Sequence, residues 1–275
     1  MRTAYKVILR REPDEAELDK YVDGLRLFRL NAWDIVDHLR TFDEYRNRTP
    51  VGAPSLLQSL HISRCEFIIG LPPAKRIIDL GGSHTNDPRG GLVLLGYPYD
   101  CDDLVIVDLP PEDRHDLYKS RAWTSTPTPR GPVRYEFRSM TDLSFAADGS
   151  VDLVYSGQSI EHVTPDDAKR VFAEVHRVLT PGGWFALDTP NGPVCRLQSP
   201  ELIDPDHEVE YSLPELVGAL EDAGFGVVER KGLNLAASSV ATNEFRPGDV
   251  AAAWGVFADG ESCYLLALVA RKPCH

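Results

Sequence analysis

The sequence predicts an α/β protein whose main domain is a doubly wound, Rossmann-like parallel sheet, with a small α-helical extension at its N-terminus. Two observations predict this fold class. From about residue 56 onward, short apolar runs alternate with amphipathic helical patterns, which is typical of a parallel sheet with helices on both faces. The first 50 residues instead carry two short helical patterns. We therefore expect a helical accessory module over residues 1–50 and the α/β domain over residues 56–275.

Composition and charge narrow the class of protein. The chain has 275 residues, of which 43% are hydrophobic and 26% charged, as expected for a globular domain with an appendage. It carries 29 Lys and Arg against 42 Asp and Glu, so its formal charge is −13. Such a surface repels phosphate backbones and anionic lipids, and no apolar run approaches the roughly 20 residues of a membrane span. We expect a cytoplasmic protein that binds neither nucleic acid nor membrane.

The N-terminal segment is balanced in charge, with 10 basic and 10 acidic residues in the first 50. Its helical patterns run through residues 18–25 and 32–39, and Asn31 is suited to cap the second one. A break rich in Pro and Gly follows at residues 47–55. Two short helices cannot bury a core alone, so we expect this segment to dock on the α/β domain or on a partner, a second copy of the chain included.

Four apolar runs, each ending in a polar residue, are the expected strands of the parallel sheet: RIIDL (76–80), LVIVDL (104–109), VDLVYS (151–156) and WFALDT (184–189). Between the last two runs, Thr164 caps an amphipathic helix that is expected to end at Pro-Gly-Gly (181–183). A second helix opens with a capping box at Ser212 and stops at Gly224. The tail, residues 262–272, is expected to form one more buried strand.

The ends of the first two strands are the first places to look for a ligand, because open α/β sheets bind ligands beyond the carboxyl ends of their strands. Asp79 is followed by Gly81 and Gly82, which permit a tight turn and a close approach to the backbone. Asp108 ends the second strand and is suited to the two hydroxyls of a ribose. The alternative is a plain turn capped by Asp79. No G-x-G-x-x-G is present to cradle a pyrophosphate, which disfavours a nucleotide-dependent oxidoreductase.

Five segments resemble, in order, the motifs of the class I S-adenosylmethionine-dependent methyltransferases. They are RIIDLGGS, VIVDLP, SMTDLSFAADGSVDLVYSGQSIEHV, RVLTPGGWFALDTPN and HEVEYSLPELVGALEDAGF. The resemblance covers about residues 65–272 and is most specific over residues 139–191. The first half departs from the family pattern, because it lacks a third close glycine and because Asp79 and Asp108 lie 29 positions apart instead of about 20. Extra residues, including 96–103, must therefore loop out.

The resemblance implies S-adenosylmethionine as the cofactor, with Asp108 at its ribose and Asp142 at its adenine amine. A helix cap is the alternative role for Asp142. Which of Ser83, His84 and Thr85 meets the cofactor stays open. The cofactor-binding residues that the resemblance implies are Asp79, Gly81, Gly82, Ser83, Asp108, Leu109, Thr141, Asp142, Ser156 and Gln158.

The resemblance places the catalytic residues Glu161 and His162 directly after the fourth motif. His162 is the candidate general base for an acceptor hydroxyl, because an imidazole titrates near neutrality. The alternative is that the Glu161-His162 pair only braces the loop. Asp188 could orient the imidazole, contact the substrate, or open a turn. The expected substrate contacts are His207, Asn191 and Tyr211. For His207 the alternative is a solvated loop position.

No metal is expected. The five cysteines are scattered and lack any C-x-x-C spacing, which indicates free thiols and no structural zinc. Some quinone-pathway methyltransferases that bind a divalent ion carry E-x-x-E-H where this chain has Gln158-Ser159-Ile160-Glu161-His162. One carboxylate and one imidazole are a poor site for a hard cation.

The N-terminal segment, with its opening Y-x-x-x-L-x-R-E-P, resembles a small helical module that is often attached to bacterial glycan-modifying enzymes. That association favours O-methylation of a hydroxyl on a sugar or oligosaccharide. Small phenolic or lipidic natural products are the alternative acceptors. A non-catalytic scaffold that binds the cofactor is the alternative to an enzyme.

Overall fold

The computed structural model describes residues 14–15, 18, 54–84, 87–114, 123, 125–128 and 130–274. The chain divides into two units, Met1–Ala53 and Pro54–His275. Apart from Asp14, Glu15 and Leu18, the first unit lies outside the described residues, and so do the helices predicted there. The helices and strands described below all belong to the second unit, Pro54–His275.

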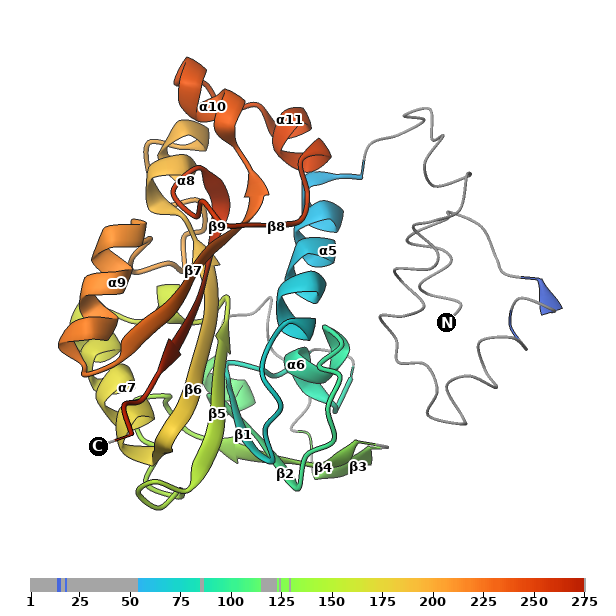
Figure 1. Cartoon of the computed structure of the whole chain (residues 1–275), viewed down its shortest axis with the longest axis vertical. Coiled ribbons are helices and arrows are strands. Elements are labelled where there is room, and N and C mark those ends of the chain that lie inside the picture. The colour runs from blue at the N-terminus through green and yellow to red at the C-terminus, as the bar shows by residue number, and fades with distance from the viewer. Residues whose placement is uncertain are drawn as a thin grey trace. The chain divides into compact units, whose positions relative to one another are not determined.

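The second unit is built around a nine-stranded sheet (Figure 1). Its elements in chain order are α5 (Leu56–Ile69), β1 (Arg76–Leu80), α6 (Gly90–Leu94), β2 (Asp103–Asp108), η2 (Pro111–Asp113), β3 (Thr126–Thr128), β4 (Gly131–Phe137), β5 (Val151–Gly157), η4 (Ile160–His162), α7 (Pro165–Val178), β6 (Leu179–Pro190), α8 (Gly192–Gln198), α9 (Leu213–Asp222), β7 (Gly226–Leu235), α10 (Ala237–Thr242), α11 (Pro247–Ala252), β8 (Val256–Phe257) and β9 (Cys263–Arg271).

The strands lie in the order β3-β4-β2-β1-β5-β6-β9-β7-β8. Strands β4, β2, β1, β5 and β6 are parallel, whereas β9 runs antiparallel to both of its neighbours, β6 and β7. The chain winds outward in one direction from β1 through β2 and in the other from β5 through β6. The carboxyl ends of β1 and β5 therefore flank the crevice in which doubly wound sheets bind ligands. The predicted fold class is confirmed.

Two apolar clusters hold the helices against the two faces of the sheet (Figure 1). On one face α7 and α9 pack, through side chains such as Phe172 and Leu216, against Ile78 and its neighbours. On the other face α5, α6, α8 and α11 pack through side chains such as Phe67 and Leu92. Because the central strands are covered on both sides, they are apolar almost throughout, as their sequences predict.

The predicted strands and helices of the second half match the structure closely. The Thr164 hydroxyl accepts a hydrogen bond from the amide of Asp167 at the start of α7, and Ser212 and Glu215 form the capping box of α9. One boundary differs. Helix α7 ends at Val178, and the Pro-Gly-Gly expected to follow it belongs to the first part of β6, which starts directly at Leu179.

No pattern in the sequence predicts helix α5, because part of its buried face is polar. Ser59 and Ser63 are fully buried there. The Ser63 hydroxyl donates to Asn234 Oδ1 at 2.6 Å, and Asn234 Nδ2 donates to the Ser59 hydroxyl at 2.8 Å. Asn234, on β7, has a φ of 56°. Hydrogen bonds to Asn234 thus hold the buried face of α5, a face that is apolar in most amphipathic helices.

Two sequence expectations concern redox state and membranes. All five cysteines are free thiols. In the part of the chain that the structure describes, no helix is both long enough and apolar enough to traverse a lipid bilayer.

Candidate functional site

The turn after β1 is shaped by glycines. Gly81 has a φ of +68°, and a Cβ there would lie 2.6 Å from the Cβ of Ser159. A Cβ on Gly82 would overlap the carboxylate of Asp79. The Ser159 hydroxyl donates to the carbonyl of Leu80 at 2.9 Å. The turns after β1 and β5 are therefore in direct contact, and only glycine fits the first of them.

Gly90 takes the place of the third glycine that the motif lacks. Its φ is +78°, and the amide of the next residue donates to the carbonyl of Gly82 at 2.7 Å. The segment between Gly82 and Gly90 and the loop of residues 95–102 after α6 both lie between β1 and β2. Together they account for the wide spacing of the first two carboxylates. Helix α6 has five residues, too few to show an amphipathic pattern.

Asp79 holds the glycine turn from behind. It is 1% exposed, and its Oδ2 accepts a hydrogen bond from the amide of Leu92 at 3.0 Å. Burial raises the pKa of Asp79 to about 7. This is the alternative role foreseen for Asp79, that of a carboxylate that caps the turn. Direct contact of Asp79 with the cofactor stays a prediction, since the hydrogen bond given for its carboxylate goes to the backbone of α6.

Asp108, Ser83 and Leu109 form an open group beside this turn. Asp108 Oδ2 accepts from the amide of Ser83 at 3.2 Å, Oδ1 accepts from the amide of Leu109 at 2.8 Å, and Arg114 Nε lies 3.4 Å from Oδ1. The Ser83 hydroxyl is buried and has no hydrogen-bond partner, while Leu109 is 41% exposed. A carboxylate, an unpartnered hydroxyl and an exposed apolar side chain suit a nucleoside, which has a polar ribose and an apolar base face.

Asp142 caps a turn in the loop after β4. Its Oδ1 accepts from the amide of Ser144 at 3.0 Å, and Arg138 lies 3.2 Å from Oδ2. The neighbouring Thr141 hydroxyl lies 2.8 Å from that of Ser139. The foreseen alternative, a capping role for Asp142, is therefore present. Because its side chain is 54% exposed, contact with an adenine amine stays a prediction.

Ser156 and Gln158 brace the turn after β5. The Ser156 hydroxyl is fully buried and lies 2.7 Å from that of Ser159. Its hydroxyl therefore has a structural role, and its contact with the cofactor stays a prediction. Gln158 has a φ of 56°, and its Nε2 donates to Asp188 Oδ1 at 2.9 Å.

Asp188 belongs to a buried network. It is fully buried, and its Oδ1 accepts from Arg64 Nε at 2.7 Å, while its Oδ2 accepts from the hydroxyl of Tyr155. Asp188 therefore does not orient His162, and that expectation is corrected. Sequence reasoning missed Arg64, because Arg64 lies on the unpredicted helix α5. With its carboxylate shared by three donors, Asp188 locks α5 to the ends of β5 and β6.

His162 and Glu161 lie on η4, directly beyond that turn. His162 Nδ1 lies 3.1 Å from the carbonyl of Asp206, so this carbonyl fixes the imidazole. Burial lowers the pKa of His162. Glu161 is 1% exposed; its Oε2 accepts from the hydroxyl of Thr189 at 2.9 Å, and its Oε1 has no hydrogen-bond partner. Burial raises the pKa of Glu161 to about 8.

His207 joins these two residues from the loop before α9. Its ring centroid lies 4.9 Å from that of His162, and its Nδ1 lies 2.8 Å from Oε1 of the buried Glu210. One potential ligand atom from each of Glu161, His162 and His207 lies within 4.8 Å of the other two. The expectation of no metal rested on one carboxylate and one imidazole, and the structure adds a second imidazole to them.

Asn191 and Tyr211, expected to contact the substrate, are structural. Asn191 is 1% exposed, and its Nδ2 donates to three carbonyls, those of Gly260, Glu261 and Cys263. Tyr211 is 7% exposed and packs in the apolar cluster under α7 and α9. Asn191 thus has a structural role in the fold, and contact of either side chain with a substrate stays a prediction.

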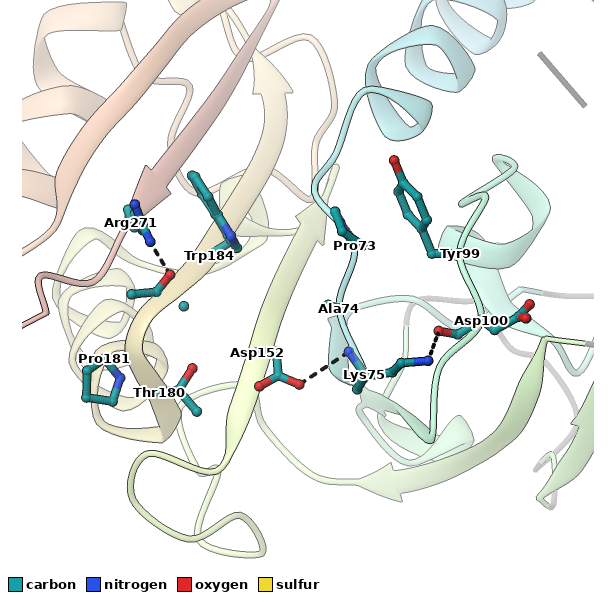
Figure 2. A pocket seen from close by; sticks show the side chains of 12 residues that line it. Pro73, Ala74, Lys75, Tyr99, Asp100, Asp152, Thr180, Pro181, Trp184 and Arg271 are labelled. Atoms are coloured by element: carbon teal, nitrogen blue, oxygen red, sulfur yellow. Dashed lines mark hydrogen bonds between the residues drawn. The ribbon is translucent and has the colours of Figure 1, made fainter. Parts of the chain in front are cut away.

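A surface hollow of about 530 Å³ lies at the opposite ends of the strands (Figure 2). Asp152, at the start of β5, accepts there from the amide of Lys75, and Arg271 donates to the carbonyl of Gly182. The Arg271 guanidinium also lies 4.8 Å from the Trp184 ring centroid. The charged side chains of the hollow are hydrogen-bonded mainly to main-chain atoms: Asp152 to the amide of Lys75, Lys75 to the carbonyl of Asp100, and Arg271 to the carbonyl of Gly182. The crevice at the carboxyl ends of the strands remains the candidate site.

Comparison with known proteins shows similarity to methyltransferases. Residues 91–187 match the family model of the methyltransferase domain. A probable S-adenosylmethionine-dependent methyltransferase from Mycolicibacterium smegmatis is 38% identical over 86 residues, and an uncharacterized methyltransferase from Synechocystis is 33% identical over 95 residues. These alignments cover 31% and 32% of this chain but only 33% and 44% of the two relatives.

Solved structures support the fold over a longer stretch. A Thermotoga maritima S-adenosylmethionine-dependent methyltransferase matches 79% of this chain and 91% of its own length, with a TM-score of 0.56 and 17% identity. A Haloferax volcanii protein solved with the Trm112 methyltransferase activator matches 80% of this chain and 92% of its own, with a TM-score of 0.55 and 20% identity. Residues 91–187 are therefore similar to a methyltransferase domain, and the second unit has the fold of these solved proteins.

Proposed function

We propose that this protein is an S-adenosylmethionine-dependent O-methyltransferase that acts on a hydroxyl of a sugar or oligosaccharide. The observation that carries the proposal is the glycine turn after β1, which leaves the buried Ser83 hydroxyl without a partner beside Asp108. A buried polar group without a partner is costly, so a ligand that satisfies it is expected in this crevice.

Five residues would hold the cofactor. Gly81 and Gly82 form the tight turn that brings the main chain to the crevice, Ser83 and Asp108 offer hydrogen bonds, and Leu109 offers an apolar surface for the base. When bound, S-adenosylmethionine supplies an electrophilic methyl group on a positively charged sulfur. The protein then has to align the acceptor and remove its proton.

His162 is the proposed acceptor of the proton that the acceptor hydroxyl loses. Its Nδ1 faces the Asp206 carbonyl, so Nδ1 carries the proton and Nε2 keeps a free lone pair. Because burial lowers its pKa, the imidazole is neutral and able to accept a proton at physiological pH. This role distinguishes His162 from the fully buried Asp188, which has no access to a substrate.

The acceptor is the least constrained part of the proposal. The sugar hydroxyl is favoured by the resemblance of the N-terminal segment to modules on glycan-modifying enzymes. Phenolic or lipidic hydroxyls are the second candidate class. The acidic charge of the chain argues against nucleic acid as the acceptor.

Calorimetric titration with S-adenosylhomocysteine tests the cofactor site, and transfer of a labelled methyl group tests the reaction. We expect one molecule bound per chain, and methyl transfer to hydroxylated glycans in a panel that also contains phenols and lipids. Absence of binding would contradict the proposal. Binding without transfer to any acceptor would instead favour a non-catalytic scaffold.

A further inference from the structure

The cluster of Glu161, His162 and His207 has a geometry that proton transfer alone does not require. Each of the three offers a ligand atom within 4.8 Å of the other two. Around a tetrahedral zinc ion with bonds of about 2.0–2.2 Å, ligand atoms lie roughly 3.3 Å apart. The three ligand atoms are thus already grouped within 4.8 Å in the structure, close to the spacing of ligands around one ion.

The hydrogen bonds of the two imidazoles leave the same nitrogen free on each ring. His162 Nδ1 faces the carbonyl of Asp206 at 3.1 Å, and His207 Nδ1 faces the carboxylate of Glu210 at 2.8 Å. Both oxygens are acceptors, so each Nδ1 carries the proton and each Nε2 keeps its lone pair. Histidines that bind metals are oriented in this way, with the second nitrogen donating to a carboxylate or a carbonyl.

Glu210 is itself held firmly. It is 5% exposed, its Oε1 accepts from the amide of Ile203 at 2.8 Å, and its Oε2 pairs with Arg196. The loop that carries His207 is also fixed to η4, because the amide of Glu208 donates to the carbonyl of Glu161 at 2.8 Å. The two histidines are therefore held together by main-chain and side-chain contacts.

The second, independent observation concerns the carboxylate. Glu161 is 1% exposed and its Oε1 has no hydrogen-bond partner, whereas its Oε2 accepts from Thr189. An unsatisfied carboxylate oxygen in the interior is costly unless a cation or a donor reaches it. A cation bound by this oxygen and by one nitrogen of each imidazole would be the partner that the carboxylate lacks.

We propose that Glu161, His162 and His207 bind one divalent transition-metal ion. Two nitrogen donors and one carboxylate suit Zn²⁺, Fe²⁺ or Co²⁺ better than Mg²⁺ or Ca²⁺, which prefer oxygen ligands. Three protein ligands leave at least one coordination position for a water or for an oxygen of the acceptor. When the metal is bound, it occupies the Nε2 lone pair of His162. His162 can therefore act as a general base only when the metal is absent.

Co²⁺ is the probe for this site, since its visible absorption reports the ligand set. Chelator-treated full-length protein is titrated with Co²⁺, and bound Co²⁺ is then displaced with Zn²⁺. We expect one Co²⁺ per chain and a spectrum without the thiolate charge-transfer band. His162→Ala, His207→Ala and the isosteric Glu161→Gln should each weaken binding more than about 10-fold.

Two other histidine variants are matched controls. His176→Ala removes an imidazole that packs on Phe225, and His61→Ala removes the one that lies 3.7 Å from the thiol of Cys65. Both should bind Co²⁺ as the wild type does. Circular dichroism and thermal unfolding of each variant establish that it is folded.

Three results would overturn the metal site: no Co²⁺ binding by the wild type, binding that survives in both His162→Ala and His207→Ala, or a thiolate spectrum. The first result does not depend on whether any variant folds. Titration of the same samples with S-adenosylhomocysteine keeps the two proposals separate. Cofactor binding without metal binding would refute only the metal site, and metal binding without cofactor binding would refute only the proposed methyl transfer.

Discussion

The turns after β1 and β5 contact each other at the same edge of the sheet, but the first is formed mainly by main-chain groups and the second mainly by side chains. The first consists of glycines and main-chain amides arranged around Asp79 and Asp108. The second consists of side chains, from Gln158 to His162, that hydrogen bonds tie to β6 and to the loop before α9. The glycine turn presents Asp108 and the unpartnered Ser83 hydroxyl, and the side-chain turn holds the imidazole of His162 in a fixed position.

This difference implies two kinds of sensitivity. At the glycine turn, added volume should be harmful, because backbone and carboxylate already fill the space behind it. At the side-chain turn, loss of a functional group should impair the reaction, because the hydrogen bonds of these side chains fix them in position. The predictions that follow separate these two kinds of sensitivity.

The largest effect is expected for His162→Ala. Removal of the imidazole should lower methyl-transfer turnover by about 100-fold or more, whereas affinity for S-adenosylhomocysteine should stay within about twofold. Initial rates with the identified acceptor, together with calorimetric titration, measure the two quantities. His176→Ala on α7 is the control, and its turnover should equal that of the wild type. A normal rate for His162→Ala would assign this residue to bracing the loop.

The next effect concerns the pH dependence of stability. Burial raises the pKa of Asp79 to about 7, above the value of about 4 in an unfolded chain. The folded state therefore keeps a proton that the unfolded state has released, and stability falls as pH rises through this interval. Asp79→Asn removes the titration. Between pH 5 and 8, the free energy of unfolding of the variant should gain about 2–3 kcal/mol relative to wild type.

Urea unfolding at the two pH values measures that gain. A constant difference between Asp79→Asn and wild type across this range would show that Asp79 is not a buried titrating group.

Gly82→Ala tests the glycine turn directly. The added Cβ would overlap the Asp79 carboxylate, so we expect a loss of about 1–3 kcal/mol in unfolding free energy and weaker binding of S-adenosylhomocysteine. Gly91→Ala is the matched control, because the nearest atom to its Cβ would lie 3.6 Å away. Chemical denaturation and calorimetry compare the two. Equal behaviour of the two variants would refute the crowding argument.

The smallest effects separate Asp108 from Asp142. Asp108→Ala should weaken the binding of S-adenosylhomocysteine by about 1–3 kcal/mol, the scale of hydrogen bonds to a charged group. Asp142→Ala should weaken it by less than about 1 kcal/mol, because this carboxylate is exposed and already caps a turn. Calorimetry under identical conditions ranks the two. A larger loss for Asp142→Ala would instead identify Asp142, in the loop after β4, as the main carboxylate that binds the cofactor.

Predictions from the sequence were most accurate where a local pattern decides the structure. The strand runs of β1, β2, β5 and β9, the cap at Thr164 and the capping box at Ser212 all follow from short stretches of chain. The glycine turn and Asp108 were located because the carboxyl end of a strand is a place that the sequence reveals.

The site was predicted less well where partners come from distant parts of the chain. Asp188 pairs with Arg64, 124 positions away, and Asn191 donates to carbonyls about 70 positions on. Such partners leave no periodic signal. The sequence therefore predicts a catalytic role for Asp188 and a substrate contact for Asn191, whereas the structure shows both side chains in buried hydrogen-bond networks. Ser83 is the opposite case, because its predicted place in the site agrees with an unpartnered buried hydroxyl.

The sequence by itself determined the fold class, its strands and caps, and the glycine turn, because each depends on residues close together in the chain. The tertiary structure alone decided that Gly90 completes that turn, that a serine face anchors α5, and that His207 meets Glu161 and His162. These contacts depend on packing between distant segments, which composition and periodicity do not encode. The physical reason is that a strand or cap forms by local bonding, whereas a site forms only where the folded chain brings separate loops together.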